Sequence, residues 1–228
     1  PWMSAGAPIG TTDASCLSRA LIAGLWHHDD PSKLAHEAGV LAVVTHKEPR
    51  CAAAAAAYAR AVSLGFSADR LTPHDFCEEL ARAAAVHDEA FAEELRHLPR
   101  VLSWEEDRAL ELLRRVAVPS AELNDTDGLP AHVSPVLLTA LYAALKVPHD
   151  FRLAMRLLLR AGGEIDAAAA LLGGLLGAHL GMACLPPRLR KGVLYVEQLE
   201  SAATKLAAAR SHQYAPALAR AAARRQGA

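Results

Sequence analysis

The sequence contains few aromatic residues and almost no net charge, and each shortage excludes a class of protein. Phe, Trp and Tyr together make up 5% of the 228 residues, so large rings cannot supply much of a core. The formal net charge is −1, which argues against a partner held mainly by electrostatic attraction. We therefore expect neither a nucleic acid nor a membrane among the partners.

Cysteines are also scarce and scattered. The four of them form no CxxC pair, so the pattern predicts neither a zinc site nor a disulfide scaffold. The start of the sequence has no charged segment followed by an apolar core, so we expect no secretory signal there. These absences are typical of a reducing compartment, and we expect a cytoplasmic protein.

Long alternation of polar and apolar residues is missing as well, which argues against a β-sheet. The sequence is instead rich in alanine, and 52% of its residues are hydrophobic, as in helices whose backbones pack closely. Signals that begin helices recur along it, at Asp30-Pro31, Glu48-Pro49, Thr72–Asp75, Ser103–Glu106 and Ser134-Pro135. The sequence therefore predicts an all-α fold.

The ends of the chain extend this helical pattern. Residues 12–25 are expected to form a capped first helix, and residues 194–210 and 215–225 to form two separate final helices. A chain of this length suffices for one domain of good size. We therefore expect a single all-helical domain over residues 1–228.

Residues 161–181 are the most informative stretch. Gly162 and Gly163 allow a tight backbone turn, and Glu164 and Asp166 follow it two positions apart. On a non-helical turn these carboxylates can converge on one point, and hard cations such as Mg²⁺ prefer carboxylate oxygens. A metal site is one interpretation. The other is that Asp166 caps the helix that follows.

The helix after this turn is unusually poor in large side chains. Gly173, Gly177 and Gly181 repeat at every fourth residue, which predicts a bare face where a neighbouring helix approaches closely. Residues 167–185 carry no formal charge and are long enough to cross a bilayer. Alanine and glycine give little transfer energy, however, and His179 interrupts the run, so we expect no membrane span.

The sequence Gly162-Gly163-Glu164-Ile165-Asp166 and its small-residue helix resemble the C-terminal signature of the ADP-ribosylglycohydrolase family, of the dinitrogenase-reductase-activating glycohydrolase type. The family signature reads Gly-Gly-Asp-Thr-Asp-Thr, and its acids and last threonine bind a pair of magnesium ions. Glu164 and Asp166 stand at the two acids, whereas Ile165 and Ala167 replace the threonines. The resemblance implies a compact orthogonal multi-helix bundle in which Glu164 and Asp166 bind Mg²⁺.

Two further segments carry the resemblance, which covers residues 10–208. Residues 42–46, Ala-Val-Val-Thr-His, are similar to a Thr-His element whose histidine lies close to bound ADP-ribose. Residues 12–19 are similar to a phosphate-holding segment, Gly-Thr-Asn-Gly-Ala-Leu-Met-Arg, of which the leucine and the arginine are kept. The resemblance implies four ligand-binding residues: His46, Ser15, Arg19 and Gly163. A different interpretation of His46 is a helix-terminal histidine that interacts with the last carbonyls.

The function implied by the resemblance is hydrolysis of an N- or O-glycosidic bond to ADP-ribose, with ADP-ribose or an ADP-ribosylated protein as partner and Mg²⁺ as cofactor. The family's Thr-Asp-Asp element, which supplies its other metal ligands, has no counterpart in this sequence, and another chain is one possible source of it. No residue is assigned as general base. Two alternatives remain: a degenerate relative that binds a nucleotide-like ligand or a protein without catalysis, and a helical interaction module.

Overall fold

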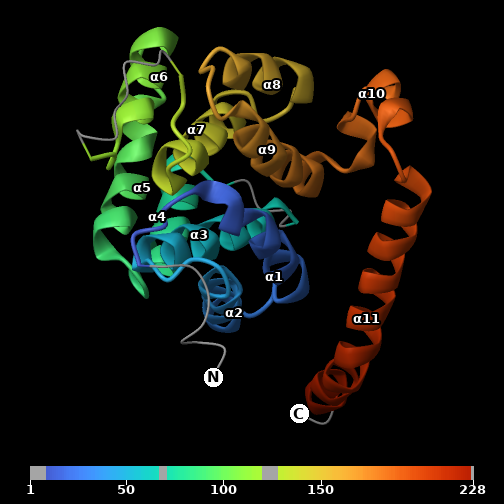
Figure 1. Cartoon of the computed structure of the whole chain (residues 1–228). Coiled ribbons are helices and arrows are strands. Elements are labelled where there is room, and N and C mark those ends of the chain that lie inside the picture. The colour runs from blue at the N-terminus through green and yellow to red at the C-terminus, as the bar shows by residue number, and fades with distance from the viewer. Residues whose placement is uncertain (1–8, 67–70, 120–127, 227–228) are drawn as a thin grey trace. The chain divides into compact units, whose positions relative to one another are not determined.

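The computed structural model describes residues 9–66, 71–119 and 128–226, with side chains as far as residue 211 (Figure 1). Most of these residues lie in helices, and none of them lies in a strand apart from two isolated β-bridges, which confirms the all-α fold. The chain divides into two compact units, Pro1–Cys184 and Leu185–Ala228, and each is described by itself. The single domain over residues 1–228 stays a prediction.

The first unit holds nine α-helices and two short 3₁₀-helices in the part of the chain described. They are η1 (Ala14–Arg19), α1 (Ala20–Trp26), α2 (Pro31–Val43), α3 (Pro49–Gly65), α4 (Pro73–Ala85), α5 (Glu89–Val101), α6 (Glu106–Arg115), α7 (Val133–Lys146), α8 (Phe151–Leu159), α9 (Ile165–Leu180) and η2 (Met182–Cys184). None of the described helices is long and apolar enough to cross a membrane.

Several helices begin where their capping residues predict. The Asp30 carboxylate accepts the Lys33 amide at 3.0 Å at the start of α2. The Thr72 hydroxyl accepts the Asp75 amide at 3.1 Å at the start of α4. Proline at the first helical position follows each of these caps. Neighbouring residues are therefore sufficient to predict where α2 and α4 begin.

Two other helix starts differ from the prediction. The first helical segment begins at Ala14, not Thr12, with Asp13 as its cap, and its opening six residues form the 3₁₀-helix η1. Glu105, not Ser103, caps α6, because the Ser103 hydroxyl donates to the Arg100 carbonyl at the end of α5. At η1 a tertiary contact, and at α6 the end of the preceding helix, decides which side chain reaches the unpaired amides of the first helical turn.

The second unit consists of α10 (Pro187–Gly192) and α11 (Val196–Gln226). The two separate final helices expected over 194–210 and 215–225 are wrong, because one continuous helix spans both. The guanidinium of Arg190 on α10 pairs with Glu200 on α11.

Helix α3 lies among the other helices of the first unit (Figure 1) and contacts α1, α2, α4, α7 and α9. Its run of alanines, residues 52–57, is buried throughout. Small side chains let neighbouring backbones approach, and at Gly24 on α1 an added Cβ would lie 2.5 Å from the Ala59 carbonyl oxygen. The alanine-rich sequence thus forms the centre of this unit.

The glycine-lined face expected on α9 is wrong. An added Cβ at Gly173, Gly177 or Gly181 would meet no atom of the described first unit within 4 Å, so no helix of that unit approaches there. The close approach occurs at Gly174, where a Cβ would lie 2.3 Å from the Tyr58 hydroxyl. Helix α9 has small residues on several of its faces. Tertiary packing, not the spacing of these residues, selects the row that faces α3.

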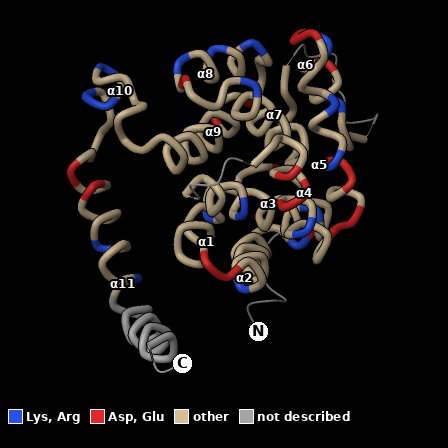
Figure 2. The backbone as a smooth tube through the Cα atoms, turned by 180° about the vertical axis from the view of Figure 1, so that it is seen from behind, with Lys and Arg blue, Asp and Glu red and all other residues tan. Residues whose placement is uncertain are grey.

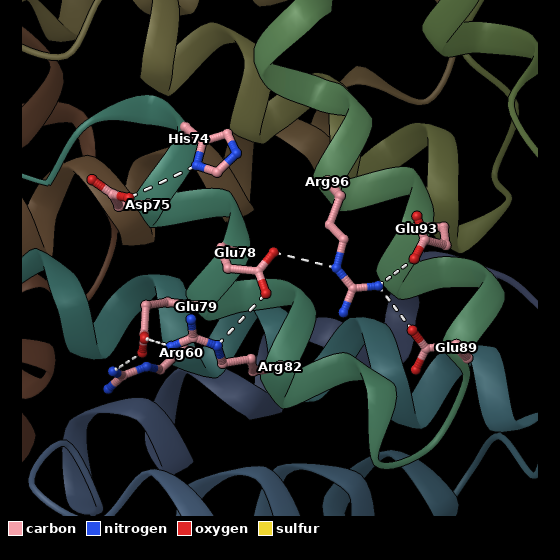
Figure 3. A network of polar contacts seen from close by, with 9 residues as sticks. All are labelled: Arg60, His74, Asp75, Glu78, Glu79, Arg82, Glu89, Glu93 and Arg96. Atoms are coloured by element: carbon pink, nitrogen blue, oxygen red, sulfur yellow. Dashed lines mark hydrogen bonds and ion pairs between the residues drawn. The ribbon is translucent and has the colours of Figure 1, made fainter.

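Charged residues gather on α4, α5 and α6, whereas α7 and α9 carry few of them (Figure 2). Figure 3 shows Arg96 on α5 paired with Glu78 on α4 and with Glu89 and Glu93 on its own helix. Beside this network is a cavity of about 410 Å³, whose lining residues are Arg60, Leu64, Leu71, Asp75, Glu78, Glu79 and Arg82. None of the residues expected at the functional site lines this cavity.

Candidate functional site

His46 is buried, with 4% of its surface exposed, and both of its ring nitrogens are bonded within the protein. Its Nε2 lies 3.0 Å from Oδ2 of Asp13, and its Nδ1 lies 2.8 Å from the Thr45 hydroxyl oxygen. Because a carboxylate only accepts, Nε2 carries the proton toward Asp13. The alternative interpretation of His46, that its side chain bonds the last helix carbonyls, is therefore wrong.

Arg19 extends this contact into a chain of four side chains. Its guanidinium donates to the Thr45 hydroxyl and to the Leu41 carbonyl, the latter at 3.3 Å. A guanidinium only donates, so Thr45 accepts from Arg19, and its own proton is available to Nδ1 of His46. The hydrogen bonds run from Arg19 through Thr45 and His46 to Asp13, and they hold the histidine between a cation and a carboxylate.

Asp13 is the acidic end of this chain. Its Oδ1 accepts the Ser15 amide at 2.9 Å, which caps η1. Partial burial alone would raise the pKa of Asp13, but the hydrogen bonds from Ser15 and His46 outweigh burial and lower the pKa to about 2. Asp13 is therefore ionised at every physiological pH.

Residues 128–133, which we call the connecting segment, join this cluster to the turn before α9. The Ala14 amide donates to the Ala131 carbonyl at 2.9 Å, and the Val133 amide donates to the Thr12 carbonyl at 2.7 Å. At its other end, Leu129 forms a parallel bridge with Gly163. Helix α9 also contacts η1 directly. Segments far apart in the sequence thus meet around one short piece of backbone.

Glycine is required where the connecting segment meets the turn. Gly163 has a φ of 68°, a conformation that side chains disfavour. An added Cβ there would lie 2.3 Å from both the nitrogen and the oxygen of Leu129. A Cβ on Gly128 would lie 2.6 Å from the Gly163 nitrogen. The two glycines therefore allow the backbones to touch.

The two acids of the turn are both exposed. Glu164 occupies the cap position of α9, and its side chain makes no capping hydrogen bond. The interpretation of Asp166 as the cap is wrong, because the helix begins at Ile165 and Asp166 lies within its first turn. There Oδ1 of Asp166 accepts the Ala167 amide at 2.9 Å. Its negative charge still interacts favourably with the positive end of the helix dipole.

A sequence model of the ADP-ribosylglycohydrolase family matches residues 1–216. The chain belongs to the ADP-ribosylglycohydrolase family. It is also 28% identical, over 205 residues, to an uncharacterized protein of Archaeoglobus fulgidus, covering 90% of this chain and 60% of that relative. The chain thus spans about 60% of the length of the relative it matches. No solved structure matches the chain.

The donor atoms at the turn have the chemistry that magnesium prefers. Mg²⁺ is held in many proteins by one or two carboxylates, with waters and substrate oxygens completing six ligands. Glu164 and Asp166 supply two exposed carboxylates on one turn. Across the described ranges, no group of three or more His, Cys, Asp or Glu is placed to hold a metal. Ala167 stands at the place of the family's threonine ligand, so Glu164 and Asp166 are the two side-chain ligands that the described residues supply at this turn.

The structure brings three of the expected ligand-binding residues into one cluster. Ser15, Arg19 and His46 are linked through Asp13 and Thr45, while Gly163 meets the same connecting segment at its other end. Asp13 was not among the site residues expected from the sequence of this ADP-ribosylglycohydrolase family member. The signal was available, since Asp two positions before Ser15 is a common capping arrangement.

Proposed function

We propose that the protein is a hydrolase that cleaves an N- or O-glycosidic bond to ADP-ribose, with Mg²⁺ as cofactor. The observation that carries the proposal is the connecting segment, which pairs with both the Asp13 region and the Gly163 turn. Membership of the ADP-ribosylglycohydrolase family supports the type of reaction. ADP-ribose or an ADP-ribosylated protein is the proposed partner, and the cytoplasm the proposed location.

Each residue of the site has a limited role in this chemistry. Glu164 and Asp166 would hold Mg²⁺, which supplies Lewis-acid polarisation and orients ribose hydroxyls and water when bound. His46 fixes the Asp13 carboxylate, and Gly163 keeps the turn against Leu129. With a pKa of about 2, Asp13 is a poor proton acceptor at neutral pH. We therefore assign no general base among these residues.

Release of ADP-ribose from an ADP-ribosylated protein tests the proposal. We expect release that requires Mg²⁺ and stops when the metal is chelated. Asp166→Asn should reduce the rate by at least about 100-fold, since losing even a residue that only orients a metal ligand costs 10–100-fold. Asp150→Asn is a matched control, because Asp150 caps α8 through the Leu153 amide and lies outside the site.

The outcomes of this assay separate two functions. An equal rate in Asp166→Asn and Asp150→Asn, or release unaffected by chelation, would contradict the magnesium mechanism. ADP-ribose binding without any release would favour the second candidate, a degenerate family member that binds a nucleotide-like ligand or a protein. The replacement of a hydroxyl ligand by Ala167 is the observation that favours this candidate.

A further inference from the structure

Two of the four cysteines, Cys16 and Cys51, meet where η1 contacts α3. Both side chains are fully buried. The Cys51 thiol donates to the Thr11 carbonyl and the Cys16 thiol donates to the Asp13 carbonyl, each with a sulfur–oxygen distance of 3.6 Å. These carbonyls belong to residues two positions apart in the sequence. Both sulfurs therefore lie against the same short piece of backbone.

The two thiols also interact with each other. A hydrogen bond with Cys16, together with burial, raises the pKa of Cys51 above its ordinary value, and nearby carboxylates add to the shift. At Cys77 on α4, by contrast, burial alone raises the pKa to about 12. Sulfurs near enough to share a hydrogen bond need only a small movement to reach the length of a disulfide, about 2 Å.

A hydroperoxide can oxidise this pair in two steps. Cys16 reacts first, because thiolates are the nucleophiles and the raised pKa keeps Cys51 protonated. Hydrogen peroxide transfers one oxygen atom to the Cys16 sulfur, which becomes a sulfenic acid while one water is released. The Cys51 sulfur then attacks the Cys16 sulfur, the S–O bond breaks, and the hydroxyl leaves with the Cys51 proton as a second water. Two thiols are oxidised and one peroxide is reduced.

We propose that Cys16 and Cys51 are a site of oxidative modification, at which a hydroperoxide forms an intramolecular disulfide that ties η1 to α3. Their burial admits only a small oxidant, and it places the sulfenic acid beside Cys51, so the disulfide forms before further oxidation. In a reducing compartment the pair remains as thiols until the oxidant appears. The cross-link restricts the unfolded chain and stabilises the folded one. The inference is independent of the proposed hydrolysis.

Treatment of the full chain with hydrogen peroxide, followed by mass spectrometry, tests this assignment. We expect the intact mass to fall by about 2 Da, the two hydrogens lost when a disulfide forms. After proteolysis without reduction, the peptides that contain Cys16 and Cys51 should be linked. The midpoint of thermal unfolding should rise by about 5 °C or more, and dithiothreitol should reverse both changes.

Cys16→Ala and Cys51→Ala should each abolish the mass loss and the rise in the midpoint. The control is Cys184→Ala, which removes the partly exposed cysteine and should leave both changes intact. If either of the first two variants fails to fold, the linked peptides of the wild type still identify the bond. Oxygen added to Cys16 or Cys51 without a link, a disulfide that includes Cys184, or an unchanged midpoint would overturn the proposal.

Discussion

Replacing Gly163 by alanine is expected to lower the free energy of unfolding by about 3 kcal/mol, from a left-handed backbone cost and a steric cost of similar size. The backbone at Gly163 has a φ of 68°, and the new Cβ would lie 2.3 Å from two backbone atoms of Leu129. Because these contacts are backbone, no side-chain rotation relieves them. Urea denaturation followed by circular dichroism measures the change.

Gly177→Ala is the matched control on the helix that follows. Gly177 lies within α9, and a Cβ added there meets nothing within 4 Å. Alanine is favoured over glycine in helices, so this variant should be stabilised by about 0.5–1 kcal/mol. Similar losses in both variants would show that Gly163 has no special role and that the contact with Leu129 is not tight.

Replacing Arg50 by methionine should lower the free energy of unfolding by about 3 kcal/mol, because it leaves two largely buried carboxylates without their cation. Arg50 Nη1 lies 2.5 Å from Glu94 and 3.0 Å from the Ser134 hydroxyl, and its Nε lies 3.4 Å from Asp88. Glu94 and Asp88 are each only 18% exposed. Urea denaturation again measures the loss.

The loss in Arg50→Met should also depend on pH. Burial raises the pKa of Glu94 above its ordinary 4.5, although Arg50 and Ser134 oppose the shift. An acid whose folded pKa is raised destabilises the protein above that pKa, and the penalty disappears as the pH falls to the unfolded value. Removing Arg50 raises the folded pKa further, so the deficit of the variant should shrink as the pH is lowered toward about 4.5.

Two companion variants check this explanation. Arg82→Met removes an arginine that is 64% exposed and should cost less than about 1 kcal/mol. Combining Arg50→Met with Glu94→Leu should recover part of the loss, because it removes one of the two carboxylates that Arg50 neutralises and leaves only Asp88 without the cation. A loss in Arg50→Met that equals the loss in Arg82→Met, or that does not vary with pH, would contradict a buried ion pair.

The elements that the sequence predicted well are those decided by neighbouring residues. The starts of α2 and α4 follow from Asp30 with Pro31 and from Thr72 with Pro73, because a cap needs only groups three residues away. The Gly162-Gly163 turn was likewise predicted, and both glycines have positive φ. Local chemistry is enough at these positions, and family resemblance is not needed.

The elements that were missed depend on contacts between distant segments. Asp13 caps η1 while its neighbours Thr12 and Ala14 hydrogen-bond to the connecting segment, about 120 residues further on. Which row of small residues on α9 meets α3 is likewise settled by Tyr58 packing at Gly174. Neither contact has a periodicity or spacing that a single sequence displays.

A single site that spans η1 and the start of α9 can be tested directly by following the backbone amides of isotope-labelled protein during titration with ADP-ribose and Mg²⁺. We expect the amides of Ser15 and Glu164 to shift together and to give the same Kd, because the connecting segment joins their surroundings. Shifts at one of these amides alone, or at neither, would contradict a shared site.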